Sequence, residues 1–193
     1  PGSRKVMKPA WIIFALAALA QWFVPLFGVW QHEQVIARGV TVKIRCFAPD
    51  PYDPLRGRYL AVSPRETSAA APPGLSSGEP VPVWATLTSA EDGLATIESL
   101  SLEPVAGPTV IRLTARRNTW DDDQGTAFVR WPFDRLYLNE RIAPEADRVM
   151  AERLRDESTV VVAEVRLLDG RAVLTDVLID GKPIREIVKQ KVP

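Results

Sequence analysis

Residues 9–30 have the sequence PAWIIFALAALAQWFVPLFGVW, a stretch without a single ionisable side chain. As an α-helix with a rise of about 1.5 Å per residue, it would be roughly 33 Å long, which matches a bilayer hydrocarbon core about 30 Å thick. The sequence therefore predicts one transmembrane helix over residues 9–30. The helix can extend to residue 38, because Gly39 is a residue type that commonly ends helices.

Basic residues flank the predicted span on one side only. Arg4, Lys5 and Lys8 precede it, and after it no Lys or Arg occurs before Arg38. By the positive-inside rule, we expect the N-terminal tail, residues 1–8, to be cytoplasmic. The remaining chain, residues 39–193, would then form a periplasmic domain at a bacterial inner membrane.

A cleaved signal peptide is the alternative interpretation of the N-terminal stretch. Ala18-Leu19-Ala20 has the small-x-small pattern of a cleavage site. We favour an uncleaved anchor, because the apolar run continues to Trp30, which is too long for the apolar region of a signal peptide.

The two faces of the predicted span differ in side-chain size. Aromatic residues cover a little more than half of the circumference, and the opposite face carries Ala17, Gln21, Val24 and Gly28. Small residues with one amide allow another helix to approach and form a hydrogen bond inside a membrane. We therefore expect these four residues to form a helix-docking face. A lipid-facing anchor whose periodicity is accidental remains the alternative.

Composition excludes one class of partner and one kind of cross-link. The 193 residues carry 24 basic and 24 acidic side chains, so the chain lacks the positive surplus that phosphate-backbone binding requires, and nucleic acid is not expected as a partner. Cys46 is the only cysteine and cannot form an internal disulfide. It alternates with apolar residues, so we expect it to face a core rather than act as a reactive or lipid-modified thiol.

The remainder of the chain has the period-two patterns and turn signals of antiparallel strands. With about 160 residues beyond the span, there is room for one domain or two small ones. We predict a β-dominated α+β fold, a meander of about eight strands with one packed helix over residues 144–156. The expected strands cover residues 40–47, 59–63, 81–87, 94–102, 110–116, 126–138, 159–168, 171–179 and 182–188.

The connections have several different signals. Residues 64–80, rich in Pro, Ala, Ser and Gly, are predicted to be a flexible loop. Asp92-Gly93, Asp169-Gly170 and Asp180-Gly181 are two-residue turn signals between strands. Asp121-Asp122-Asp123 could suggest calcium, but it lacks the glutamate and glycine spacing of a calcium loop, so we expect a solvated turn.

One stretch carries a resemblance to a known family. Asp50-Pro51-Tyr52-Asp53-Pro54-Leu55-Arg56-Gly57-Arg58-Tyr59-Leu60-Ala61-Val62 resembles the motif region of the GDYXXLXY family of bacterial envelope proteins. Phe133-Asp134-Arg135-Leu136-Tyr137-Leu138 and Leu178-Ile179-Asp180-Gly181-Lys182-Pro183 are similar to the C-terminal half of that family. The resemblance covers most of residues 35–185.

The chain departs from the family motif at three positions. Gly57 and Tyr59 match, but Arg58 replaces the aspartate, Val62 replaces the leucine, and Pro64 replaces the last tyrosine. Any task of the family aspartate is therefore lost here. The resemblance implies an anchored, extracytoplasmic domain without an assigned activity, often associated with a polytopic membrane protein.

Residues for catalysis are scarce, so we expect no enzyme activity. His32 is the only histidine, lies next to the membrane, and has no nucleophile motif nearby. With one His and one Cys, a metal site would depend on carboxylates alone, and we expect no metal and no cofactor. A membrane-anchored Ser-Lys hydrolase of the signal-peptidase type would need a serine soon after the span, but none occurs between Ser3 and Ser63.

The densest polar group lies in the Pro-rich connection. Asp50, Asp53, Arg56 and Arg58, followed by Tyr59, could contact a ligand or partner, with the arginines as a fork for a carboxylate or phosphate. The alternative is structural, because Asp-Pro pairs initiate turns through their own side chains.

Together these patterns predict a non-enzymatic accessory or scaffold subunit. It would dock its span and its periplasmic domain onto a polytopic protein or a multi-subunit inner-membrane complex, such as a respiratory or photosynthetic one, while embedded in the lipid bilayer. A periplasmic ligand-binding module tethered to the membrane is the second hypothesis.

Overall fold

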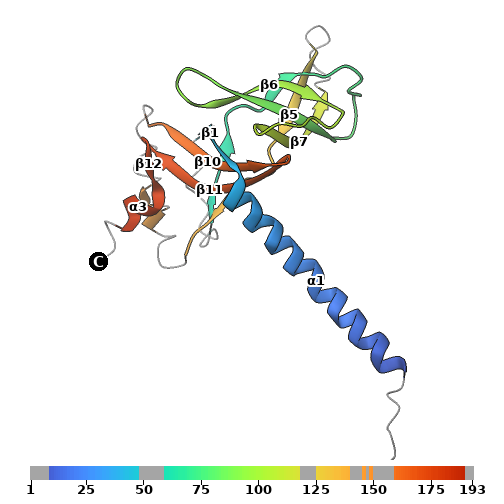
Figure 1. The fold of residues 1–193 in the computed structure, drawn as a ribbon. Helices are drawn as coiled ribbons and strands as arrows, with labels where there is room; N and C mark the ends of the chain where they lie inside the picture. Colours follow the sequence, from blue (N-terminus) through green and yellow to red (C-terminus); the bar gives the residue numbers. More distant parts are fainter. Residues whose placement is uncertain are drawn as a thin grey trace, which may run out of the picture.

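A long helix, α1, protrudes from a β-rich domain in the computed structural model, which describes residues 9–47, 59–117, 125–139, 145–146, 148–149 and 159–189 (Figure 1). α1 (Pro9–Arg38) continues through Pro25 and ends where the Gly39 amide donates to the Val35 carbonyl at 2.9 Å. A Cβ atom at position 39 would lie 2.4 Å from that carbonyl oxygen and 3.0 Å from the Leu167 carbonyl oxygen, so only glycine fits here. α1 is long and apolar enough to cross a membrane, and none of its most apolar part is buried by the rest of the described chain.

The first sheet begins directly after α1 and pairs segments from both ends of the chain. Its order is β12-β11-β10-β1-β3, and every described pairing is antiparallel. The pairing of β1 with β10 places Val42 opposite Val165, so the sheet is not the meander that local patterns predicted. The strands are β1 (Val40–Phe47), β3 (Ser63–Pro64), β10 (Val161–Leu168), β11 (Arg171–Ile179) and β12 (Lys182–Pro183).

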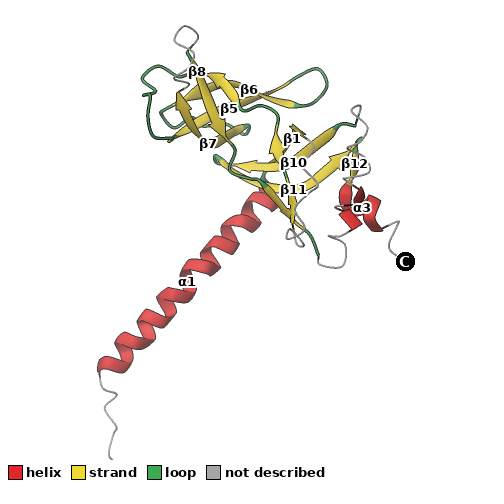
Figure 2. Cartoon of the chain, turned by 180° about the vertical axis from the view of Figure 1, so that it is seen from behind, coloured by secondary structure: helices red, strands yellow, loops and turns green. Residues whose placement is uncertain are grey.

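The second sheet comes from the middle of the chain and has the order β4-β8-β7-β5-β6. β2 and β9 form a separate two-stranded ribbon, which within the described chain has no strand pairing with the second sheet. In this ribbon Tyr59 lies opposite Tyr137. Figure 2 shows the two larger sheets meeting at the end of α1. The strands are β2 (Tyr59–Ala61), β4 (Ser68–Ala70), β5 (Val81–Ser89), β6 (Ala95–Ser101), β7 (Val110–Arg117), β8 (Thr126–Arg130) and β9 (Arg135–Tyr137).

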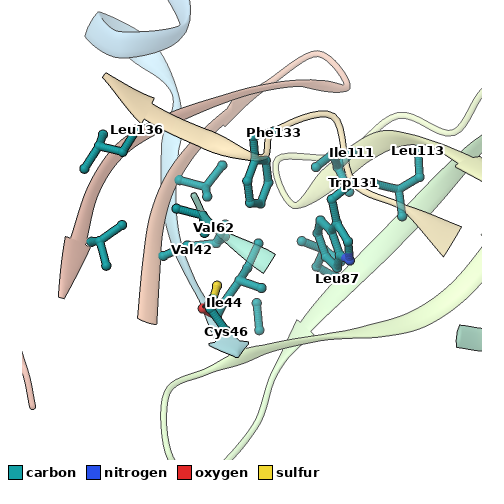
Figure 3. Packing of buried hydrophobic residues seen from close by; sticks show 14 of the residues in the cluster. Val42, Ile44, Cys46, Val62, Leu87, Ile111, Leu113, Trp131, Phe133 and Leu136 are labelled. Carbon is teal, nitrogen blue, oxygen red and sulfur yellow. Dashed lines mark hydrogen bonds between the residues drawn. The ribbon is translucent and has the colours of Figure 1, made fainter. Parts of the chain in front are cut away.

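Buried side chains of both sheets form one apolar cluster. Ile44 of β1 and Ile111 of β7 are almost fully inaccessible to solvent and belong to the same cluster. Trp131 and Phe133, whose ring centroids are 5.7 Å apart, enter it from the segment between β8 and β9 (Figure 3). The Trp131 indole N–H donates to the Glu66 carbonyl at 2.7 Å, which satisfies the one polar group of that side chain.

Cys46 faces this core, as its alternation with apolar residues predicted. Its residue is 3% exposed. Burial raises the pKa of the Cys46 thiol to about 11, and a hydrogen bond with the backbone of Ala163 makes a smaller, opposing contribution. The thiol is therefore protonated at neutral pH and packs as a small apolar side chain.

Three of the expected elements differ in the structure. Residues 182–188 were predicted as a strand, but they form β12 and then a helix, α3 (Ile184–Lys189). Ile184 and Val188 are the buried residues of α3, and their spacing of four is helical, so the packed face follows the helical period instead of the strand period. The predicted strand 126–138 is divided into β8 and β9, with Pro132 in the gap.

The predicted flexible loop, residues 64–80, is also wrong in part. It contains the end of β3 and the whole of β4, which pairs with β8. Leu75 is 2% exposed and belongs to the core. Burial of Leu75 and pairing of the edge strand β4 with β8 order this segment, although its composition is typical of a loop.

The predicted helix over residues 144–156 and the predicted turns lie partly within the described residues. In the predicted helix 144–156, residues 145, 146, 148 and 149 are helical, and Ala146 and Val149 are buried. The turns at Asp169-Gly170 and Asp180-Gly181 are confirmed, because all four residues have positive φ, as tight hairpin turns require. Asp121-Asp122-Asp123 lies outside the described residues.

Candidate functional site

The hairpin turn between β10 and β11 joins the two sheets. The Arg112 amide of β7 donates to the Gly170 carbonyl at 2.8 Å. A Cβ atom at Gly170 would lie 2.3 Å from the ring of Trp84, and Gly170 has a φ of 77°. The turn therefore needs glycine both for its conformation and for its contact with the second sheet.

The same hairpin holds the C-terminal end of α1. Val35 is 2% exposed and is the buried anchor of these last turns. The Arg171 guanidinium donates to the Gln31 side-chain oxygen, and Arg166 donates to the Gly39 carbonyl at 3.2 Å. One apolar contact and two hydrogen bonds thus fix the direction in which α1 leaves the domain, beside β11 in both views (Figures 1 and 2).

These contacts border an open cleft of about 640 Å³ between α1 and both sheets, which we call the junction cleft. α1 contributes one face, β7 and β8 a second, and the start of β11 a third. Three arginines and one histidine line the cleft, and no Asp or Glu is among its described lining residues. The lining residues are Gly28, Gln31, His32, Val35, Pro82, Arg112, Leu113, Thr114, Arg130, Trp131, Pro132, Gly170, Arg171, Ala172 and Val173.

Strand register explains how the arginines come together. Thr114 of β7 pairs with Arg130 of β8, and Arg112 lies two residues from Thr114 on the same side of the sheet. Arg171 follows Gly170 in the hairpin that docks on β7. Within the described part of the chain, none of these three arginines forms an ion pair with a carboxylate.

A second cleft, of about 600 Å³, adjoins the first and shares His32, Pro132, Ala172 and Val173 with it. Here the cationic side chains have acidic neighbours. Arg135 lies 3.5 Å from Asp134, and Arg185 lies 4.0 Å from Asp176. The second cleft is therefore close to charge balance, whereas the junction cleft is not.

The Asp176 carboxyl group, next to Arg185, has a perturbed pKa. Burial is the largest cause and raises the pKa of the Asp176 side chain above its ordinary value, with smaller raising contributions from Glu164 and Glu186. The Val177 amide, which donates to this carboxyl at 2.8 Å, and Arg185 oppose the rise. Asp176 pairs with Glu164 across β10 and β11, so the contribution of Glu164 follows from the sheet register.

The residues expected to form a polar site are only partly described. Asp50, Asp53, Arg56 and Arg58 lie outside the described residues. Tyr59 lies in β2, half-buried, with the Arg135 guanidinium 4.8 Å from its ring centroid and the Tyr137 ring edge-on at 6.2 Å. Tyr59 thus supports two residues that line the second cleft.

The predicted docking face of α1 lies bare. Val24 is 72% exposed, and a Cβ atom at Gly28 would have no neighbour within 4 Å. Gly28 also borders the junction cleft, which joins the docking face to the domain. No contact of the described chain covers Ala17 or Gln21, which are exposed.

Sequence patterns did not indicate the junction cleft. Arg112, Arg130 and Arg171 are far apart along the chain, and each has the pattern of an ordinary outward-facing strand residue. The available signal was Asp169-Gly170, whose glycine marks a close backbone approach, but its partner Trp84 cannot be inferred locally. Among the described residues, no group of three or more His, Cys, Asp or Glu side chains could hold a metal ion.

Comparison with known protein families decides the relationship of the chain. The model of the GDYXXLXY protein family matches residues 21–177, which is most of the sequence. The chain belongs to the GDYXXLXY family. Comparison with curated proteins and comparison with solved structures gave no match.

The GDYXXLXY motif lies where the chain passes from the ribbon to the first sheet. Tyr59 pairs with Tyr137 of β9, and five residues later Pro64 pairs with Cys46 of β1. Val62 and Pro64, which replace the family leucine and tyrosine, are both buried. The described part of the motif in this GDYXXLXY protein therefore supplies packing, to which the substituted residues Val62 and Pro64 contribute.

Proposed function

We propose that this GDYXXLXY protein is a non-enzymatic accessory or scaffold subunit of an inner-membrane assembly. It docks α1 against a transmembrane helix of a polytopic partner and presents its β domain in the periplasm. The observation that carries the proposal is the contrast along α1, whose last turns are fixed to the domain while its most apolar part has no contact within the described chain.

The chemistry of the bare face favours a helix as its occupant. Ala17, Gln21, Val24 and Gly28 are spaced four, three and four residues apart, so they form one stripe. The absence of a side chain at Gly28 permits close approach of another backbone, and Gln21 offers an amide for an interhelical hydrogen bond. Pro25 has no amide proton, so the carbonyl of Gln21 also lacks its usual helical donor.

Aromatic side chains on the other face fit lipid tails or a planar hydrophobic group. Phe23 and Phe27 stack with ring centroids 5.7 Å apart, and Phe27 and Trp30 stack at 5.8 Å. Such a face would suit the interior of a respiratory or photosynthetic complex, where pigments, quinones and lipids pack between helices.

The non-enzymatic part of the proposal rests on the side chains of the junction cleft. Its described lining includes His32 and Thr114 but no Ser, Cys, Asp or Glu. A histidine without an orienting carboxylate and a strong nucleophile is a poor catalytic base. Hydrolysis that disappeared in a single-residue variant would contradict this part.

Purification in mild detergent tests the docking proposal. We expect the full chain to co-purify with a polytopic membrane protein, and we expect Gln21→Leu and Gly28→Leu to weaken that association about tenfold or more, since they remove a hydrogen bond and close approach. Ala15→Leu is the matched control, because residue 15 lies about half a turn from this face. A protein that stays monomeric, or responds equally to all three changes, would contradict docking.

Reporter fusions test the orientation. The basic tail, with Arg4, Lys5 and Lys8, supports a cytoplasmic N-terminus. Alkaline phosphatase fused after residue 193 should be active, since it requires the periplasm to form its disulfides. An inactive fusion combined with an active cytoplasmic reporter would reverse the topology.

A further inference from the structure

We propose that the junction cleft binds the phosphate of an anionic phospholipid headgroup, taken from the bilayer leaflet that faces the domain. The inference is independent of helix docking, because it rests on Arg112, Arg130 and Arg171 and on the position of the cleft along α1. A phospholipid headgroup and free inorganic phosphate both carry a phosphate group that the arginines could bind. A competition experiment distinguishes these two sources.

The position of the cleft matches the depth of lipid headgroups. Its α1 wall is formed by Gly28, Gln31, His32 and Val35. The last apolar residue of the predicted span is Trp30, so this wall begins within the final turn of the span and continues one turn beyond it. If α1 crosses the bilayer, the cleft lies at the boundary between hydrocarbon and water.

Charge is the second observation. Three arginines line the cleft, and its described lining has no Asp or Glu to neutralise them. The whole chain has a formal net charge of zero, so this surplus comes from folding and not from composition. Guanidinium groups bind phosphate oxygens through paired hydrogen bonds, so we expect the cleft to prefer phosphate over chloride.

The cationic side chains are partly oriented before any ligand binds. The Arg171 guanidinium donates to the Gln31 side chain of α1. The backbone of Arg112 is fixed by the hydrogen bond that its amide donates to the Gly170 carbonyl. Thr114 lies between Arg112 and Arg130 in the strand register and adds a hydroxyl donor. Holding donors in place lowers the conformational cost of binding an anion.

The same features favour an anionic phospholipid over a zwitterionic one. The ammonium group of a zwitterionic headgroup would find no described carboxylate in the lining of this cleft. The open space at Gly28, where a Cβ would have no neighbour within 4 Å, leaves room for the glycerol backbone beside the helix. The acyl chains could then continue along the span, a route that a soluble anion does not need.

Native mass spectrometry of the full chain, released from nanodiscs of phosphatidylcholine with a minor share of phosphatidylglycerol, tests the proposal. We expect phosphatidylglycerol adducts to exceed their share of the bilayer. Arg112→Gln and Arg130→Gln should each reduce them by about fivefold to tenfold, from the usual strength of charge-assisted hydrogen bonds at a partly exposed site. Arg116→Gln, on the same strand but outside the cleft lining, should change nothing.

Each other outcome contradicts the proposal. Equal binding of both lipids by the unchanged protein removes the anionic preference, and this comparison needs no variant to fold. Arginine variants that behave like Arg116→Gln place the lipid elsewhere. Displacement of phosphatidylglycerol by submillimolar inorganic phosphate would identify a soluble anion as the ligand. Arginine variants that lose a protein partner but keep the lipid would show that the cleft binds an acidic protein surface. Gln21→Leu should leave lipid binding intact, which separates this test from that of docking.

Discussion

One face of α1 is packed against the domain near the C-terminal end of the helix and exposed towards its N-terminal end. Towards the C-terminus, Gln31 and Val35 are held by the β10–β11 hairpin, and Gly39 ends the helix against β10. Towards the N-terminus, Gln21 and Gly28 continue the same stripe with no cover in the described chain. A helix that only needed to anchor a domain would not require a fixed direction, so the fixed end of α1 supports the proposal that the helix packs against a partner.

The largest effect is expected from breaking the hairpin contact that aims α1. Gly170→Ala should destabilise the protein by about 3 kcal/mol, because it adds a positive-φ penalty to a clash with the Trp84 ring. Gly181→Ala is the matched control, since Gly181 has a similar φ of 79° but open space around it. It should cost about 1 kcal/mol.

Thermal unfolding of the full chain in detergent, followed by circular dichroism, measures both variants. Gly170→Ala should also shift α1 relative to the domain. Equal losses in the two variants would mean that the Trp84 contact does not matter.

A smaller effect is expected at the buried anchor of the same helix. Val35→Ala removes two carbon atoms from a residue that has almost no exposed surface, and we expect a loss of about 2 kcal/mol. Val40→Ala, at a residue that is largely exposed, should cost much less. Thermal unfolding that ranks the two variants in the opposite order would show that Val35 does not hold α1.

The smallest effect is expected in the pH dependence of the free energy of unfolding, which should not alter the contacts of α1. The pKa of Asp176 is raised in the folded protein, so its contribution to stability is present below the ordinary carboxyl pKa and is lost as pH rises through the raised value. Relative to Asp176→Asn, the unchanged protein should therefore gain stability as pH falls through that window. Plots of unfolding free energy against pH that run parallel for the unchanged protein and Asp176→Asn would contradict this. If Asp176→Asn changed partner binding, the region of the second cleft would affect α1.

Much of the fold follows from local patterns. The apolar run predicts α1, and Gly39 marks its end because a Cβ atom there would lie 2.4 Å from the Val35 carbonyl oxygen of the last turn. Alternation of apolar and polar residues predicts β1 and β10, and the Asp-Gly pairs at residues 169–170 and 180–181 predict the turns that join β10, β11 and β12. These signals need only neighbours in the sequence.

The rest depends on contacts between distant segments. Tertiary packing decides that Val42 pairs with Val165 and that Trp84 contacts Gly170. The periodicity of the sequence around each residue does not indicate these partners. The junction cleft has the same origin, since Arg130 is brought beside Arg112 only by the register of β7 and β8. Residues 182–188 were assigned to a strand because a short apolar pattern fits both periods, and burial of Ile184 and Val188 favours the helix.

The central claim is that one face of α1 contacts a partner helix, and photo-crosslinking in native membranes tests it most directly. A photoreactive residue would be placed in turn at Ala17, Gln21, Val24 and Gly28, and at Ala15, Leu19 and Leu26 on the other side. We expect crosslinks to one polytopic protein from the first four positions and to lipid from the other three. Crosslinks without this helical period, or crosslinks to lipid from all seven positions, would contradict it.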